Sequence, residues 1–200
     1  RLCAGKLAET KSACAAALEA EGQPEDALTL YLDAGRWIDA ARLTLAQAQS
    51  CMALGRLETL QRWIDRLPQS VRAELPWISF WRGTCHTVVN PSEGRTIFEL
   101  AYTDFKVAGD RDGCLMTWAG ISESYFFAMG DFSGFARWVV EIERLLPAST
   151  EFPNRATEVR VVGGALGMLM HRPDHPAIAL WAERALALIP QLPDTHSRVQ

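Results

Sequence analysis

The sequence has little of what nucleic-acid binding or membrane insertion requires. Its 24 Asp and Glu outnumber its 20 Lys and Arg and give a net charge of −4, whereas nucleic acids and anionic membranes are bound by basic surfaces. No apolar run approaches the roughly 20 residues that cross a bilayer. We therefore expect neither a direct nucleic-acid contact nor a membrane contact from this chain.

Cysteine is scarce and odd in number. The five cysteines form no C-x-x-C pair and lie in apolar stretches of helical appearance: Cys3, Cys14, Cys51, Cys85 and Cys114. Disulfide frameworks use even numbers of cysteines outside the cytosol, and zinc sites need paired spacings. We interpret these thiols as small, reduced hydrophobic residues, which predicts a cytoplasmic protein.

Strand signals are almost absent, since no alternating run of β-branched and aromatic residues recurs between turns. Helix signals are frequent instead. Residues 13–21 are almost entirely Ala, Leu and Glu, and residues 40–54 repeat Ala and Leu at offsets of three and four. Glycines interrupt such runs where helices should stop, at Gly22, Gly35, Gly55, Gly109 and Gly130. The sequence thus predicts an all-α fold.

A second pattern overlies the helices, in which a small residue is followed four positions later by an aromatic one. It occurs at Ala27/Tyr31, Thr59/Trp63, Gly94/Phe98, Gly134/Trp138 and Ala177/Trp181, and successive aromatics are 32 to 43 residues apart. Spacings of this size are typical of helical repeats. An offset of four puts both residues on one helix face, where the small residue lets the preceding helix approach and the aromatic fills the space between hairpins.

These offsets resemble the second helix of the tetratricopeptide repeat. We predict a single domain over residues 1–200, an α-solenoid in which about five antiparallel helix pairs stack into a right-handed superhelix. The predicted pairs are 4–21 with 24–34, 37–54 with 57–67, 77–89 with 93–108, 112–129 with 132–146, and 155–171 with 174–189. Because the sequence begins at Arg1 without an initiator Met or a signal peptide and ends at Gln200, we interpret it as a piece excised from a larger protein.

Three stretches narrow the resemblance. GRWIDAARL from Gly35, GRLETLQRWIDRLP from Gly55 and LPW from Leu75 resemble the helical-repeat region of large ATP-dependent LuxR-type transcriptional activators, of the maltose-regulon activator type. The resemblance implies a non-enzymatic sensor arm of a bacterial signal-transduction ATPase, which binds an effector or a partner protein and couples that binding to self-association. ATP is implied only for a separate N-terminal module, because this chain has no nucleotide-binding loop, and we expect no cofactor here.

Two other classes of function stay open. Many tetratricopeptide proteins are constitutive protein–protein scaffolds without a small-molecule effector. An enzyme is poorly motivated, because adjacent Cys85 and His86 point about 100° apart on a helix, and prolines break the helix that would join His171 to His175. The acidic stretch around Asp112 lacks the order of a calcium loop, so we interpret it as a turn in which Asp112 caps the next helix.

The candidate site is a groove lined by successive first helices of the repeats. Its predicted residues are Arg82 and His86 on one helix, Trp118 and Tyr125 on the next, and Arg160 on the one after. Stacked hairpins would place these faces side by side, giving two aromatic platforms with cationic edges that suit a sugar, a nucleotide-like effector or an acidic peptide. If both aromatic side chains are buried, no such groove exists.

Overall fold

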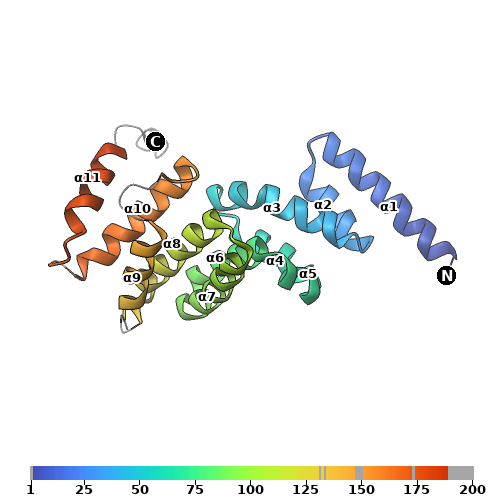
Figure 1. The fold of residues 1–200 in the computed structure, drawn as a ribbon. Helices are drawn as coiled ribbons and strands as arrows, with labels where there is room; N and C mark the ends of the chain where they lie inside the picture. Colours follow the sequence, from blue (N-terminus) through green and yellow to red (C-terminus); the bar gives the residue numbers. More distant parts are fainter. Residues whose placement is uncertain (1, 131, 133, 147–150, 173, 189–200) are drawn as a thin grey trace. The chain divides into compact units, whose positions relative to one another are not determined.

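The computed structural model describes residues 2–130, 132, 134–146, 151–172 and 174–188, with side chains from residue 6 onward. Every regular element in these residues is an α-helix, and none is a strand (Figure 1). The helices are α1 (Leu2–Ala20), α2 (Pro24–Asp33), α3 (Trp37–Ala53), α4 (Leu57–Arg66), α5 (Gln69–Glu74), α6 (Pro76–Val89), α7 (Pro91–Ala108), α8 (Arg111–Ala128), α9 (Phe135–Leu145), α10 (Arg155–Met170) and α11 (Ile178–Leu188). The all-α prediction is confirmed.

Two compact units make up the chain, Arg1–Cys85 and His86–Gln200, and the boundary between them falls inside α6. We call them the N-terminal unit and the C-terminal unit and describe each by itself. The single domain and the right-handed superhelix stay predictions.

The helix ends follow local backbone chemistry. Four of the five glycines expected to stop helices adopt the left-handed conformation, with φ of 76° at Gly22, 69° at Gly35, 68° at Gly55 and 70° at Gly109. The end of α8 differs, because Met129 adopts the left-handed conformation there, with φ of 45°, and Gly130 does not. This conformation costs a non-glycine residue roughly 1 kcal/mol.

Most predicted helix bounds hold to within two residues, and three local features differ. Helices α9 and α11 begin three and four residues later than predicted, after turns at Gly134 and Ala177. The short α5 was not predicted; it follows Pro68, whose φ of −55° suits a helix start. Asp112 is not the cap of α8, because the Asp110 side chain accepts the N–H of Gly113 at 2.9 Å instead. Predicted helical positions 133 and 189 lie outside the described residues.

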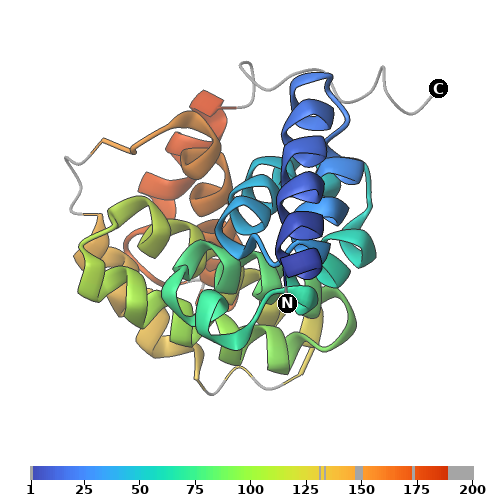
Figure 2. The same ribbon diagram turned by 90° about the vertical axis from the view of Figure 1, so that its right-hand side faces the viewer.

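In the N-terminal unit, each of α1 to α4 packs against its neighbour in sequence, and α1 and α2 lie side by side in both Figure 1 and Figure 2. A charged cluster ties α1, α2 and α3 together: the Arg42 guanidinium donates to both Glu19 carboxylate oxygens, at 2.8 and 2.7 Å, and Tyr31 Oη donates to Glu19 at 3.2 Å. These bonds hold the pKa of Glu19 below its usual value, with Arg42 the largest cause.

In the C-terminal unit, helices that are consecutive in sequence form antiparallel pairs. A Cβ at Gly120 would lie 2.6 Å from the Phe98 ring, and one at Gly113 would overlap the Phe105 ring. The later residue of α7 therefore contacts the earlier residue of α8, so the two helices run antiparallel. Both aromatic side chains are buried, so the two glycines of α8 make room for the aromatics of α7.

Alternate helices of the C-terminal unit run parallel. Between α8 and α10, the contacts Ser122–Gly164 and Asp112–Thr157 join residues 42 and 45 positions apart. Between α7 and α9, contacts join residues 35 to 39 positions apart. A nearly constant offset means that both helices advance in the same direction, which is how stacked hairpins place their first and second helices.

The five aromatics of the small/aromatic pattern are all buried: Tyr31, Trp63, Phe98, Trp138 and Trp181. Their small partners permit close approach as expected. A Cβ on Gly94 would come within 2.8 Å of the backbone of Thr87 in α6, and one on Gly134 would overlap Tyr125 Oη of α8. The prediction that the small residue makes room for the preceding helix is confirmed at these two positions.

Candidate interaction site

The two aromatic residues of the predicted groove are buried. Trp118 is 0% exposed, and its indole Nε1 donates to the Trp138 carbonyl at 2.8 Å. Tyr125 is 4% exposed, with the Arg95 guanidinium 3.9 Å from its ring centroid. The expectation of two open aromatic platforms is wrong, because this face of α8 is covered by the neighbouring helices. A binding role for the five predicted residues stays a prediction.

The other three residues of the predicted groove, two arginines and a histidine, fall in different surroundings. The Arg160 guanidinium donates to both carboxylate oxygens of Glu123 in α8, at 2.8 and 2.7 Å, so its charge is already matched. His86 Nδ1 lies 3.3 Å from a Glu93 carboxylate oxygen. Arg82 belongs to the N-terminal unit, whereas the other four residues belong to the C-terminal unit.

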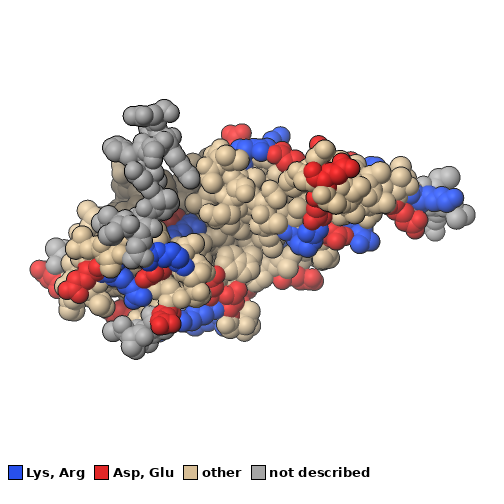
Figure 3. All heavy atoms as spheres, turned by 90° about the horizontal axis from the view of Figure 1, so that it is seen from above, with Lys and Arg blue, Asp and Glu red and all other residues tan. Residues whose placement is uncertain are grey.

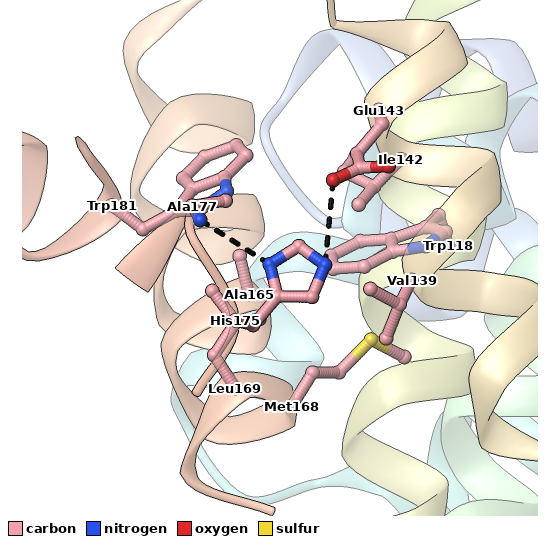
Figure 4. A pocket seen from close by; sticks show the side chains of 10 residues that line it. All are labelled: Trp118, Val139, Ile142, Glu143, Ala165, Met168, Leu169, His175, Ala177 and Trp181. Atoms are coloured by element: carbon pink, nitrogen blue, oxygen red, sulfur yellow. Dashed lines mark hydrogen bonds and ion pairs between the residues drawn. The ribbon is translucent and has the colours of Figure 1, made fainter. Parts of the chain in front are cut away.

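A small pocket does lie against Trp118, between α8, α9, α10 and the start of α11. Figure 4 shows its lining: Trp118, Val139, Ile142, Glu143, Ala165, Met168, Leu169, His175, Ala177 and Trp181. It holds about 230 Å³ of empty space but leaves only about 10 Å³ to the centre of a water molecule, which is room for one ordered water. Organic ligands occupy pockets of roughly 300 Å³ or more, so this pocket is too small to enclose one.

His175 closes one side of that pocket. Its Nδ1 accepts the backbone N–H of Ala177 at 3.3 Å, which leaves the proton of a neutral ring on Nε2. That Nε2 lies 3.5 Å from a carboxylate oxygen of Glu143 in α9, and Figure 4 shows the ring between the two partners. His175 therefore joins the turn before α11 to α9.

A second, more open pocket lies between the parallel helices α7 and α9. We call it the α7/α9 cleft, and its lining residues are Tyr102, Lys106, Arg137, Trp138 and Glu141. It leaves about 220 Å³ to the centres of water molecules. Each helix contributes at least one aromatic residue and one cation, so the cleft combines the side-chain types that recognition sites use most.

Glu141 is the anchor of the cleft. One of its carboxylate oxygens accepts from Tyr102 Oη at 2.6 Å and from Lys106 Nζ at 2.8 Å, and Arg144 lies 3.6 Å from the other. The bonds from Lys106 and Tyr102 hold the pKa of Glu141 below its usual value. Burial, together with the bond to Glu141, raises the pKa of Tyr102 well above its usual range. Glu141 is thus ionised at neutral pH, and its carboxylate is fixed in position by these hydrogen bonds.

The cations of the cleft lie over aromatic rings and reach into solvent. The Lys106 and Arg137 side chains are 62% and 61% exposed. Lys106 Nζ lies 5.7 Å from the Tyr102 ring centroid, and Arg137 Cζ lies 5.2 Å from the Trp138 ring centroid, both within the range of a cation–π attraction. Arg137 also pairs with Glu99 of α7.

Acidic and basic side chains are interspersed on the face of the molecule shown in Figure 3. Around the cleft the balance is positive. The charged lining residues and their ion-pair partners comprise three cations, Lys106, Arg137 and Arg144, and two carboxylates, Glu99 and Glu141. The cleft therefore favours an anionic ligand group.

The described residues contain potential metal ligands and three buried thiols. No group of three His, Cys, Asp or Glu among them could hold a metal ion. Burial raises the pKa of the Cys85 thiol to about 12 and that of the Cys114 thiol to about 11, so both are protonated and unreactive at neutral pH. The described helices include none that is long and apolar enough to cross a membrane.

The cleft was not predicted from the sequence, because binding residues were expected on first helices. The sequence did contain a signal. One predicted second helix carries Glu99 followed by Lys106, and the next carries Arg137 followed by Glu141, so the charges occur in the same order with opposite sign. Pairing the second helices in parallel would have matched Glu99 to Arg137 and Lys106 to Glu141.

Comparison with known proteins identifies no relative: no protein-family model, no curated protein and no solved structure matches this chain. The resemblance to LuxR-type activators stays a prediction from the sequence stretches alone.

Proposed function

We propose that this chain is a non-enzymatic regulatory arm of a bacterial signal-transduction ATPase, in which it binds an effector or a partner protein and couples that binding to self-association. The observation that supports it is the burial of all five repeat aromatics at their second-helix positions. Arms of stacked helix hairpins serve to present long surfaces to partners.

Several features of the described residues agree with a binding arm. Alternate helices of the C-terminal unit run parallel, so surface clefts form between helices that are distant in sequence. The α7/α9 cleft is one of these, and its two cations reach into solvent. The cysteines with described side chains are all free, in keeping with the cytoplasmic location we propose.

The link to an ATPase, and through it to a transcriptional activator, rests on the resemblance of the stretches beginning at Gly35 and Gly55. In this proposal ATP binds a separate module, DNA contacts belong to a separate output module, and the present chain supplies neither. An effector acts by binding one assembly state more tightly than the other.

The test uses the full reading frame that encodes this chain. We expect a nucleotide-binding loop on the N-terminal side, and we expect the full protein to self-associate in the presence of ATP in an effector-dependent manner, measured by light scattering. Deleting residues 1–200 should leave ATP hydrolysis intact and abolish the effector dependence.

Two results would contradict the proposal. A reading frame without any nucleotide-binding module removes the signalling ATPase. Assembly whose effector dependence survives the deletion shows that the arm carries no regulation. Constitutive partner binding without any effector would instead identify the scaffold class of tetratricopeptide proteins.

A further inference from the structure

We infer that the α7/α9 cleft receives an acidic side chain from a segment of a partner protein, with the carboxylate bound between Lys106 and Arg137. This inference rests on the proposed function, which requires a partner or effector, and it names the chemistry of that partner. The internal contacts of the cleft, its charge and the surface around it lead to the same ligand.

Hydrogen-bond donors outnumber acceptors in the cleft. A lysine ammonium has three N–H donors and an arginine guanidinium has five. Lys106 gives one hydrogen bond to Glu141, and the ion pair of Arg137 engages one guanidinium nitrogen with Glu99. Glu141 already accepts from both Tyr102 and Lys106, so a ligand donor would find its best-placed oxygen occupied. An acceptor-rich anion can bind without breaking an internal pair, which is what a carboxylate provides.

The cleft is large enough for an acidic side chain. It leaves about 220 Å³ to the centres of water molecules, within about 440 Å³ of space that includes open solvent. The single net positive charge is also too small for a nucleic acid, whose binding needs several phosphate contacts. One carboxylate fits the cleft, and the rest of its molecule must lie on the surface beside it.

That surface is partly apolar. Leu100 and Val107 are seven residues apart on α7 and exposed, and Val140 is exposed on α9 between Arg137 and Arg144. Helical geometry places Leu100 and Val107 on one stripe, about 100° around α7 from Lys106. We expect this stripe and Val140 to form an apolar border beside the cleft. A segment that carries leucine-like residues next to Glu or Asp would bury this border while its carboxylate enters the cleft.

The experiment measures fluorescence anisotropy of a short fluorescein-labelled peptide of glutamate and leucine as the 200-residue chain is added. A peptide with glutamine in place of every glutamate is the matched ligand control, and unlabelled glutarate tests the free carboxylate. We expect the glutamate peptide to bind, the glutamine peptide to bind at least tenfold more weakly, and glutarate to compete only at far higher concentration.

The variant Lys106→Gln/Arg137→Gln should weaken peptide binding about tenfold, since it removes both exposed cations that would hold the carboxylate. Arg36→Gln is the matched control, because Arg36 is a similarly exposed arginine paired with Asp39 in the N-terminal unit. Its affinity should stay unchanged. Val140→Ser tests the apolar border without touching a charge and should weaken binding about threefold. Circular dichroism melting verifies that each variant is folded.

Equal binding by the double variant and the original chain overturns the inference, as does equal binding of the two peptides. If glutarate binds as tightly as the peptide, the claim that the ligand is a segment of a partner protein is wrong, since the cleft would then be a site for a free carboxylate. If the peptide fails while the full protein still assembles in an effector-dependent manner, this inference alone is wrong and the proposed function stands.

Discussion

Replacing Gly94 with alanine tests the claim that small residues set the distance between the helices of a hairpin. The new Cβ would lie 2.8 Å from both Thr87 Cα and Thr87 N, which are backbone atoms of α6. A backbone cannot swing away as a side chain can, so α6 must shift. Overpacking of this kind costs about 1–3 kcal/mol, against a gain of roughly 1 kcal/mol because alanine favours helix over glycine. We expect a net destabilisation of about 2 kcal/mol, since a backbone clash lies at the upper end.

Gly163→Ala is the matched control. Gly163 lies inside α10 and is exposed, and an added Cβ would meet no neighbouring atom within 4 Å, so the same substitution should stabilise the protein by roughly 0.5–1 kcal/mol. Gly167→Ala should fall between the two, because its Cβ meets the half-buried ring of Phe126 at 2.6 Å and that ring can rotate. Urea denaturation followed by circular dichroism gives the three free energies of unfolding. A neutral Gly94→Ala, or a Gly163→Ala as damaging as Gly167→Ala, would refute the packing argument.

Three further predictions concern the C-terminal unit and the cysteines. Trp118→Phe should cost about 1–3 kcal/mol in urea denaturation, because it removes the buried indole N–H that donates to the Trp138 carbonyl of α9. Lys106→Met should raise the pKa of Glu141, measured by NMR titration. Since that pKa is lowered in the folded state, its contribution to stability is present at neutral pH and lost as the pH falls through the folded pKa, and the variant should show less of this acid-dependent loss. Iodoacetamide at neutral pH should modify exposed Cys14 faster than buried Cys85, as peptide mass spectrometry would show.

Local chemistry made the helices predictable. The left-handed glycines at 22, 35, 55 and 109 end helices through their own backbone freedom, and Pro24 and Pro91 begin helices because their fixed φ suits the first turn. The end of α8 was predicted to within one residue, but Met129 adopts the left-handed conformation there in place of the expected Gly130. No residue pattern within that helix predicts the left-handed conformation of Met129.

The helical class, most helix bounds and the burial of the five repeat aromatics follow from the amino-acid sequence, because periodicity and turn residues act within one helix or between neighbours along the chain. Which surfaces stay open depends instead on how the helices pack. Trp118 and Tyr125 are buried because other helices cover their face of α8, and Arg160 is neutralised by a carboxylate 37 residues away. The α7/α9 cleft likewise arises where parallel helices bring Tyr102 and Glu141 together across 39 residues. Burial and ion pairing depend on neighbours in space, and the spacing of residues within one helix does not specify them.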